Sequence, residues 1–72
     1  MDKLTWEDAE DIGIALFEKH PDTKPLSIRF TDLHDWVCAL EEFGDEPMKS
    51  TEGKLEAIQM AWQEEYEDEH GG

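Results

Sequence analysis

The sequence predicts a small, mainly α-helical domain in which three helices are accompanied by one short strand. The chain has 72 residues, which is enough for one domain, so we expect a single domain over residues 1–72. Three segments carry apolar residues at the 3.6-residue period of a helix. Two loops that contain proline separate these segments and set the order of the predicted elements.

The first helix is predicted to run roughly from Trp6 to Lys19. Thr5 is a suitable N-cap, and Asp8 stands three residues later as its capping-box partner. Pro21 ends the pattern, because a proline disfavours helical geometry in the residue before it. The face expected to be buried consists of Trp6, Ala9, Ile12, Gly13, Leu16 and Phe17.

A short strand is predicted at residues 27–30, where apolar and polar residues alternate. A second helix follows, with Thr31 or Asp32 as its N-cap and Gly44 as its C-terminal stop. This helix has the most regular amphipathic pattern in the chain, formed by Leu33, Trp36, Val37, Leu40 and Phe43.

The third helix is predicted to start near Ser50 or Thr51. Its apolar stripe consists of Leu55, Ile58, Trp62 and Tyr66. Beyond Tyr66 the residues are mostly acidic and offer no apolar anchor, so we expect the tail from about residue 66 to fray. Each predicted helix carries one tryptophan on its apolar stripe, which indicates a shared aromatic core.

The chain is strongly acidic, with 20 Asp or Glu residues against 6 Lys or Arg and a net charge of −14. Nucleic-acid binding of the ordinary kind is excluded, because it needs a basic face to displace counterions. An anionic membrane surface is disfavoured for the same reason. The first residues lack the features of a signal peptide, and the single cysteine permits no internal disulfide, so we expect a cytoplasmic protein. We also expect it to be a monomer.

The acids of the first helix are candidates for holding a cation. Glu7, Asp11 and Glu18 share the polar face, with Asp8 at its edge and Asp22 in the following loop. Carboxylates at positions i and i+4 of a helix lie about 5–6 Å apart, so two of them can share a hard cation such as Fe²⁺, Mn²⁺, Mg²⁺ or Ca²⁺. Binding would be weak because no cage closes around the ion, and charge patterning alone favours a solvated acidic face.

A second candidate lies on the second helix, where His34, Cys38 and Glu41 fall at i, i+4 and i+7. This spacing suits a metal, but two soft ligands and a carboxylate do not complete a structural zinc site. The favoured interpretation is a histidine in the first helical turn and a half-exposed cysteine. No acid–base pair is shielded from water in this pattern, so we expect no enzymatic activity.

Two motifs resemble a known family. One is Phe-x-Asp-Leu-x-x-Trp at residues 30–36, and the other is Phe-x-Asp-acid-Pro at residues 43–47. Trp6-x-Asp8, His20-Pro21-Asp22 and the run from Lys54 to Trp62 support them. Together they make the chain similar to the IscX family, also called YfhJ, over roughly residues 4–65. This family consists of small acidic accessory proteins of bacterial iron–sulfur cluster assembly.

The resemblance implies a winged-helix-like fold, weak Fe²⁺ binding through exposed acids, and binding to the cysteine desulfurase IscS on a surface shared with frataxin. Contacts with ferredoxin or the scaffold protein would be indirect. Carried over to this sequence, the metal-binding acids are Asp8, Asp11, Glu18 and Asp22. The partner-binding acids are Asp32, Glu41, Glu42, Asp45 and Glu46, to which we add Asp35 on the same helix as Asp32.

Three functions are compatible with these patterns. The first is an acidic adaptor or regulator that docks on the desulfurase and carries Fe²⁺ loosely. The second is an inhibitor that blocks the desulfurase surface without iron. The third is a DNA mimic, which the charge permits but the family resemblance disfavours. A scaffold role is excluded because building a cluster needs several thiolates, and this chain has one cysteine.

Overall fold

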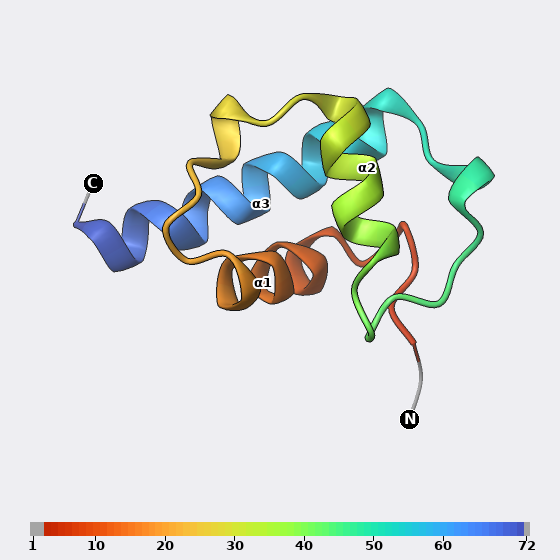
Figure 1. The fold of residues 1–72 in the computed structure, drawn as a ribbon, viewed down its shortest axis with the longest axis horizontal. Helices are drawn as coiled ribbons and strands as arrows, with labels where there is room; N and C mark the ends of the chain where they lie inside the picture. Colours follow the sequence, from red (N-terminus) through yellow and green to blue (C-terminus); the bar gives the residue numbers. More distant parts are fainter. Residues whose placement is uncertain (1–2, 72) are drawn as a thin grey trace.

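The computed structural model describes residues 3–71, which form three α-helices and two 3₁₀ turns (Figure 1). In chain order these are α1 (Ala9–Lys19), η1 (Pro25–Ser27), α2 (Phe30–Cys38), η2 (Pro47–Lys49) and α3 (Glu52–His70). The prediction of a mainly helical, three-helix fold is confirmed. Between residues 3 and 71 the extended pairing is limited to one isolated parallel bridge, Leu4 with Phe43. A winged helix is therefore not confirmed.

Helix α1 begins at Ala9, three residues later than predicted. Thr5 and Asp8 do pair, but they close a turn before the helix instead of capping it. The Thr5 N–H donates to the Asp8 carboxylate at 2.9 Å, and the Asp8 N–H donates back to the Thr5 carbonyl at 2.9 Å. Because this turn precedes the helix, Trp6 lies outside α1, although its side chain is buried as expected.

Helices α1 and α3 make the closest packing in the fold, and Gly13 makes it possible. A Cβ atom at Gly13 would lie 2.8 Å from the backbone nitrogen of Trp62 and 2.9 Å from the carbonyl carbon of Ala61. Only a residue without a side chain lets the two backbones approach this closely. The centre of the predicted apolar face of α1 is confirmed, since Ile12 and Leu16 are fully buried beside Gly13. Ala9 and Phe17 are only partly buried, and Ala15 is buried although it was not predicted.

The predicted strand at residues 27–30 is wrong. Residues 25–27 form the 3₁₀ turn η1, and α2 already begins at Phe30. The amide of Gln59 on α3 donates to the carbonyls of Pro25 at 3.0 Å and Ile28 at 3.4 Å. These carbonyls are therefore satisfied by a side chain from another element, and the segment needs no partner strand.

Helix α2 ends at Cys38, although the apolar period continues to Leu40 and Phe43. Leu40 and Phe43 are still buried, but they lie in two successive turns that follow the end of the helix. The Leu4 N–H donates to the Glu42 carbonyl at 2.7 Å, and the Gly44 N–H donates to the Leu4 carbonyl at 2.9 Å. This pairing draws the chain toward the N-terminal segment, so the prediction of Gly44 as the helix stop is wrong.

Helix α3 starts as predicted, because Thr51 caps it by accepting the Lys54 N–H at 3.2 Å. It continues to His70 and ends at Gly71, whose φ of 70° is left-handed. No apolar anchor follows Tyr66, as expected, but His70 contacts other parts of the fold. The His70 ring stacks on Tyr66 with centroids 4.2 Å apart, and its Nε2 lies 3.1 Å from the Pro21 carbonyl oxygen. Fraying of this end in solution stays a prediction.

The tryptophans contribute unequally to the core. Trp6 and Trp62 are almost fully buried, at 1% and 0% exposure. Trp36 is only partly buried and covers the edge of the core, stacked on His20 at a centroid distance of 4.2 Å. The expected aromatic core therefore has two central tryptophans and one peripheral one. The remaining core is aliphatic, apart from Phe43, and comes from all three helices and the segment after α2.

The approach of α1 to α3 yields a prediction for Gly13→Ala. The added methyl group must push against backbone atoms that cannot move independently, so we expect a loss of about 1–3 kcal/mol in the free energy of unfolding. The control is Gly53→Ala in the first turn of α3, where a Cβ would meet only the Thr51 hydroxyl at 3.9 Å. That change should stabilise the protein by about 0.5–1 kcal/mol. Urea unfolding of both variants measures the difference, and a stable Gly13→Ala variant would contradict the packing.

Candidate functional site

The candidate site is the acidic surface formed by the carboxylates that the sequence singled out. Among residues 3–71 no charged side chain is buried. Asp8 and Asp45 are half-buried, whereas the other predicted site acids are exposed: Asp11, Glu18, Asp22, Asp32, Asp35, Glu41, Glu42 and Glu46. In the same range a single carboxylate pairs with a lysine or arginine, Glu7 with Lys54 at 2.7 Å. The surface therefore presents a negative field that internal cations hardly compensate.

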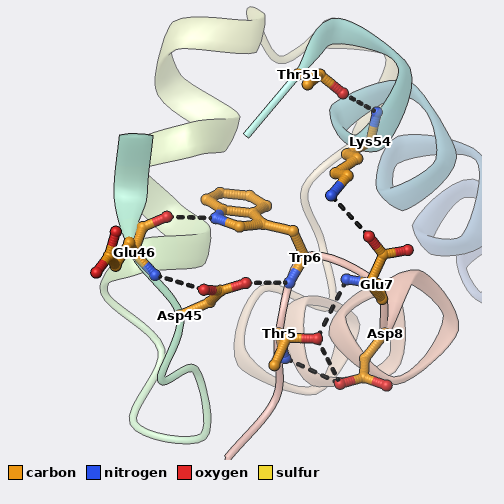
Figure 2. Close-up of polar contacts among 8 residues, drawn as sticks. All are labelled: Thr5, Trp6, Glu7, Asp8, Asp45, Glu46, Thr51 and Lys54. Carbon is orange, nitrogen blue, oxygen red and sulfur yellow. Dashed lines mark hydrogen bonds and ion pairs between the residues drawn. The ribbon is translucent and has the colours of Figure 1, made fainter. Parts of the chain in front are cut away.

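Asp45 holds the N-terminal segment to the loop before η2 (Figure 2). Its carboxylate accepts the backbone N–H of Glu46 at 2.7 Å and that of Trp6 at 3.2 Å. These two hydrogen bonds, with smaller contributions from Lys49 and Lys54, lower the pKa of Asp45 below its usual value. Asp45 was predicted as a partner-binding acid, but its hydrogen bonds give it a structural role. An Asp before an acid and a proline is a turn signal that could have indicated this.

Glu46 contributes its backbone to the fold and exposes its side chain to solvent. Its backbone carbonyl accepts the indole N–H of Trp6 at 2.6 Å (Figure 2), and its side chain is exposed. The two acids of the loop therefore differ: the carboxylate of Asp45 is engaged in the fold, and that of Glu46 faces solvent. Only Glu46 can be changed without removing a hydrogen bond of the fold.

The four acids predicted to bind metal do not converge. Asp8 stands at the N-cap of α1 and Asp22 beyond its other end, and a helix of 11 residues is about 16 Å long. Asp8 and Asp11 do share a hollow of about 340 Å³, and Glu18 and Asp22 lie outside it. The lining of this hollow is Glu7, Asp8, Ala9, Glu10 and Asp11.

Two of the acids in this hollow are already engaged. The Asp8 carboxylate accepts the Thr5 N–H, and that of Glu7 is held by Lys54 (Figure 2). Nowhere in the described part of the chain do three Asp, Glu, His or Cys side chains gather closely enough to hold an ion. A cation in this hollow would therefore have few protein ligands and keep most of its water shell.

His34 and Cys38 lie side by side, as their spacing predicts, but their contacts stabilise the fold and do not form a metal site. The Cys38 sulfur lies 4.0 Å from His34 Nδ1, while His34 Nε2 bonds the Pro47 carbonyl at 2.8 Å. Burial, and to a lesser degree the charge of Asp35, raises the pKa of the Cys38 thiol. A raised pKa disfavours the thiolate that nucleophilic chemistry or metal binding requires. Glu41 lies beyond the end of α2 and does not complete a site.

The role of Asp45 yields a prediction for Asp45→Asn. The pKa of Asp45 is lower in the folded state than in the unfolded chain. The charged carboxylate therefore stabilises the fold at any pH above the ordinary Asp pKa of about 3.9. This stabilisation is lost as the pH falls through the lowered pKa of the folded state. The variant should unfold at a lower urea concentration than the wild type at pH 7, and the gap should shrink below about pH 4. The control is Glu46→Gln, which removes one negative charge at the adjacent residue. A gap that is constant with pH would contradict this role.

Residues 4–67 match the family described as iron–sulphur cluster assembly. An uncharacterized protein of Pseudomonas aeruginosa is 48% identical over 62 residues, which cover 86% of this chain and 94% of the relative. Within residues 3–71 no helix is long and apolar enough to cross a membrane. The match spans both motifs that prompted the resemblance, so the chain belongs to the iron–sulphur cluster assembly family of IscX (YfhJ) proteins.

Proposed function

We propose that this chain is a non-enzymatic, cytoplasmic adaptor or regulator of iron–sulfur cluster assembly. It docks on a basic surface of the cysteine desulfurase IscS and carries Fe²⁺ weakly as cargo. The observation that carries the proposal is the exposed and largely unpaired acidic surface, on a chain that belongs to an assembly family. Ferredoxin and the scaffold protein would meet this chain only through the desulfurase.

The docking surface consists of exposed acids from α2 and the segment that follows it. It comprises Asp32, Asp35, Glu41, Glu42 and Glu46. Charges at the rim of an interface mainly raise the association rate by steering the partner, and salt screens this effect. Asp45 keeps the loop that bears Glu46 in place without offering its own carboxylate.

The iron-binding part of the proposal rests on the hollow at the start of α1. Asp8 and Asp11 both line it, and carboxylate oxygens are hard donors that suit Fe²⁺. One oxygen of Asp8 already accepts two hydrogen bonds from Thr5, which leaves the other oxygen for a cation. Such a site binds loosely, which is appropriate for an ion that must be handed on.

A second candidate function is an inhibitor that blocks the desulfurase without iron. One observation favours it: the side chains of residues 3–71 bring no three metal ligands together. In this case the acidic surface would serve docking alone. Sulfide production by the desulfurase, titrated with this protein in the presence and absence of Fe²⁺, separates the two. An effect that depends on Fe²⁺ supports the adaptor, and an identical effect in both conditions supports the inhibitor.

The iron site yields a prediction for Asp11→Asn. We expect about a thirtyfold loss of Fe²⁺ affinity, equivalent to about 2 kcal/mol, the Coulomb energy between one carboxylate and a divalent cation at about 4 Å in water. The control is Glu18→Gln, an exposed acid of the same helix that lies outside the hollow, and it should bind like the wild type. Anaerobic calorimetry measures both affinities. Equal losses in the two variants would show that iron binds the general charge of α1 and not the hollow.

Docking yields a prediction for the double variant Glu42→Lys and Glu46→Lys. Reversing two steering charges should lower the association rate with the desulfurase about tenfold at low salt, and the difference should shrink as salt rises. The control is Glu64→Lys with Glu69→Lys, which changes the net charge equally near the opposite end of the molecule, where α3 ends (Figure 1). Stopped-flow or surface-binding kinetics give both rates. If the control slows binding as much, the docking surface is misplaced.

A further inference from the structure

A groove separates α2 from the first turn of α3. Its volume is about 360 Å³, near the lower end of the roughly 300–1,000 Å³ found for ligand pockets. This size suits one long side chain better than a whole helix. The lining consists of Phe30, Thr31, His34 and Asp35 from α2 and of Glu52 and Leu55 from α3.

The groove combines apolar walls with two carboxylates. Phe30 is half-buried and packs against the core, and Leu55 is buried with 7% exposure. Asp35 and Glu52 are both exposed, line the groove and come from different helices. An apolar occupant alone would leave these two charges partly desolvated without compensation.

No internal cation satisfies the two carboxylates. Across residues 3–71, neither Asp35 nor Glu52 forms an ion pair with a lysine or arginine, and the nearest basic group to Asp35 is His34 Nδ1 at 3.8 Å. His34 is itself occupied, because its Nε2 bonds the Pro47 carbonyl and its ring stacks on Trp6. The groove therefore offers two acceptors to an outside donor.

We propose that this groove receives an arginine side chain from a partner protein. The aliphatic stem of arginine would pack on Leu55, and its planar guanidinium would stack on Phe30 while donating to Asp35 and Glu52. Its five donors can serve two carboxylates at once, whereas the compact lysine ammonium is more strongly hydrated. The groove thus adds a specific anchor to a surface that otherwise steers partners by charge.

This inference rests on the proposed function only for the nature of the partner, a protein with a basic surface. The groove itself is tested without any protein partner. The probe is N-acetyl-arginine methylamide, titrated into isotopically labelled full-length protein and followed by amide chemical shifts. Two comparison compounds are used. N-acetyl-lysine methylamide keeps a positive charge but lacks the planar guanidinium, and N-acetyl-norleucine methylamide keeps an apolar stem but lacks a charge.

We expect the arginine probe to shift the amides of Phe30, His34 and Leu55 and to bind more tightly than either comparison compound. Asp35→Asn and Glu52→Gln should each weaken its binding by about fivefold, the effect of one Coulomb contact at about 4 Å in water. The matched controls are Asp32→Asn on α2 and Glu56→Gln on α3, exposed acids that do not line the groove. These controls should retain the wild-type affinity for the probe.

Three outcomes would overturn the proposal. Equal binding of the norleucine compound would show an apolar pocket that ignores charge. Equal losses in the control variants would show that the probe responds to net charge alone. Absence of shifts at the groove would show that it takes no such side chain. Failure of the desulfurase test leaves this experiment unaffected, because no desulfurase is present in it.

Discussion

The indole of Trp6 lies where the N-terminal segment, the loop before η2 and helix α2 meet. Its N–H donates to the Glu46 carbonyl, and the Trp6 backbone N–H donates to the Asp45 carboxylate. One face of the ring stacks on His34, and Phe43 meets it edge-on at a centroid distance of 4.7 Å. A fully buried tryptophan satisfied in this way orders segments that are about 40 residues apart in the chain. The bend after α2 and the position of the acidic loop both depend on it.

The excess of acidic residues places a further constraint on this fold. With a net charge of −14, every carboxylate repels many others, so the fold is stable only if the charges stay in solvent. The structure meets this condition among residues 3–71, where the two half-buried site acids, Asp8 and Asp45, accept hydrogen bonds from Thr5 and from Trp6 and Glu46. In this part of the chain, the carboxylates of the remaining site acids accept no hydrogen bond from a backbone N–H. The carboxylates that stabilise the fold therefore differ from those proposed for partner binding, so the latter can be varied without removing a hydrogen bond of the fold.

The acidic surface has two distinct parts. The hollow at the start of α1 is lined by Asp8 and Asp11, the acids proposed to hold a cation. The groove between α2 and α3 offers Asp35 and Glu52 beside apolar walls. The first suits a small hard ion held loosely, and the second suits a larger cation with an apolar stem. In the proposed adaptor function both kinds of contact have a use, because the protein would release its cargo while it stays attached to a partner.

The sequence alone determined the number of helices, the start of the third helix near Ser50 or Thr51, the central residues of the buried faces of α1 and α3, and the family motifs. These features depend on residues within a turn or two of one another, where apolar periodicity and capping operate. Only the tertiary structure decided that α2 stops at Cys38, that residues 25–27 form a 3₁₀ turn, that His70 anchors the end of α3, and that Asp45 serves the fold. Each of these depends on a contact between segments 30 or more residues apart, namely Leu4 with Phe43, Gln59 with Pro25, His70 with Pro21 and Asp45 with Trp6. The candidate metal acids fail to converge for a different and local reason, because a single helix holds its two ends apart. The long-range contacts are of another kind. Local periodicity cannot specify such contacts, since they form only when the packed core brings distant backbone groups within hydrogen-bonding distance.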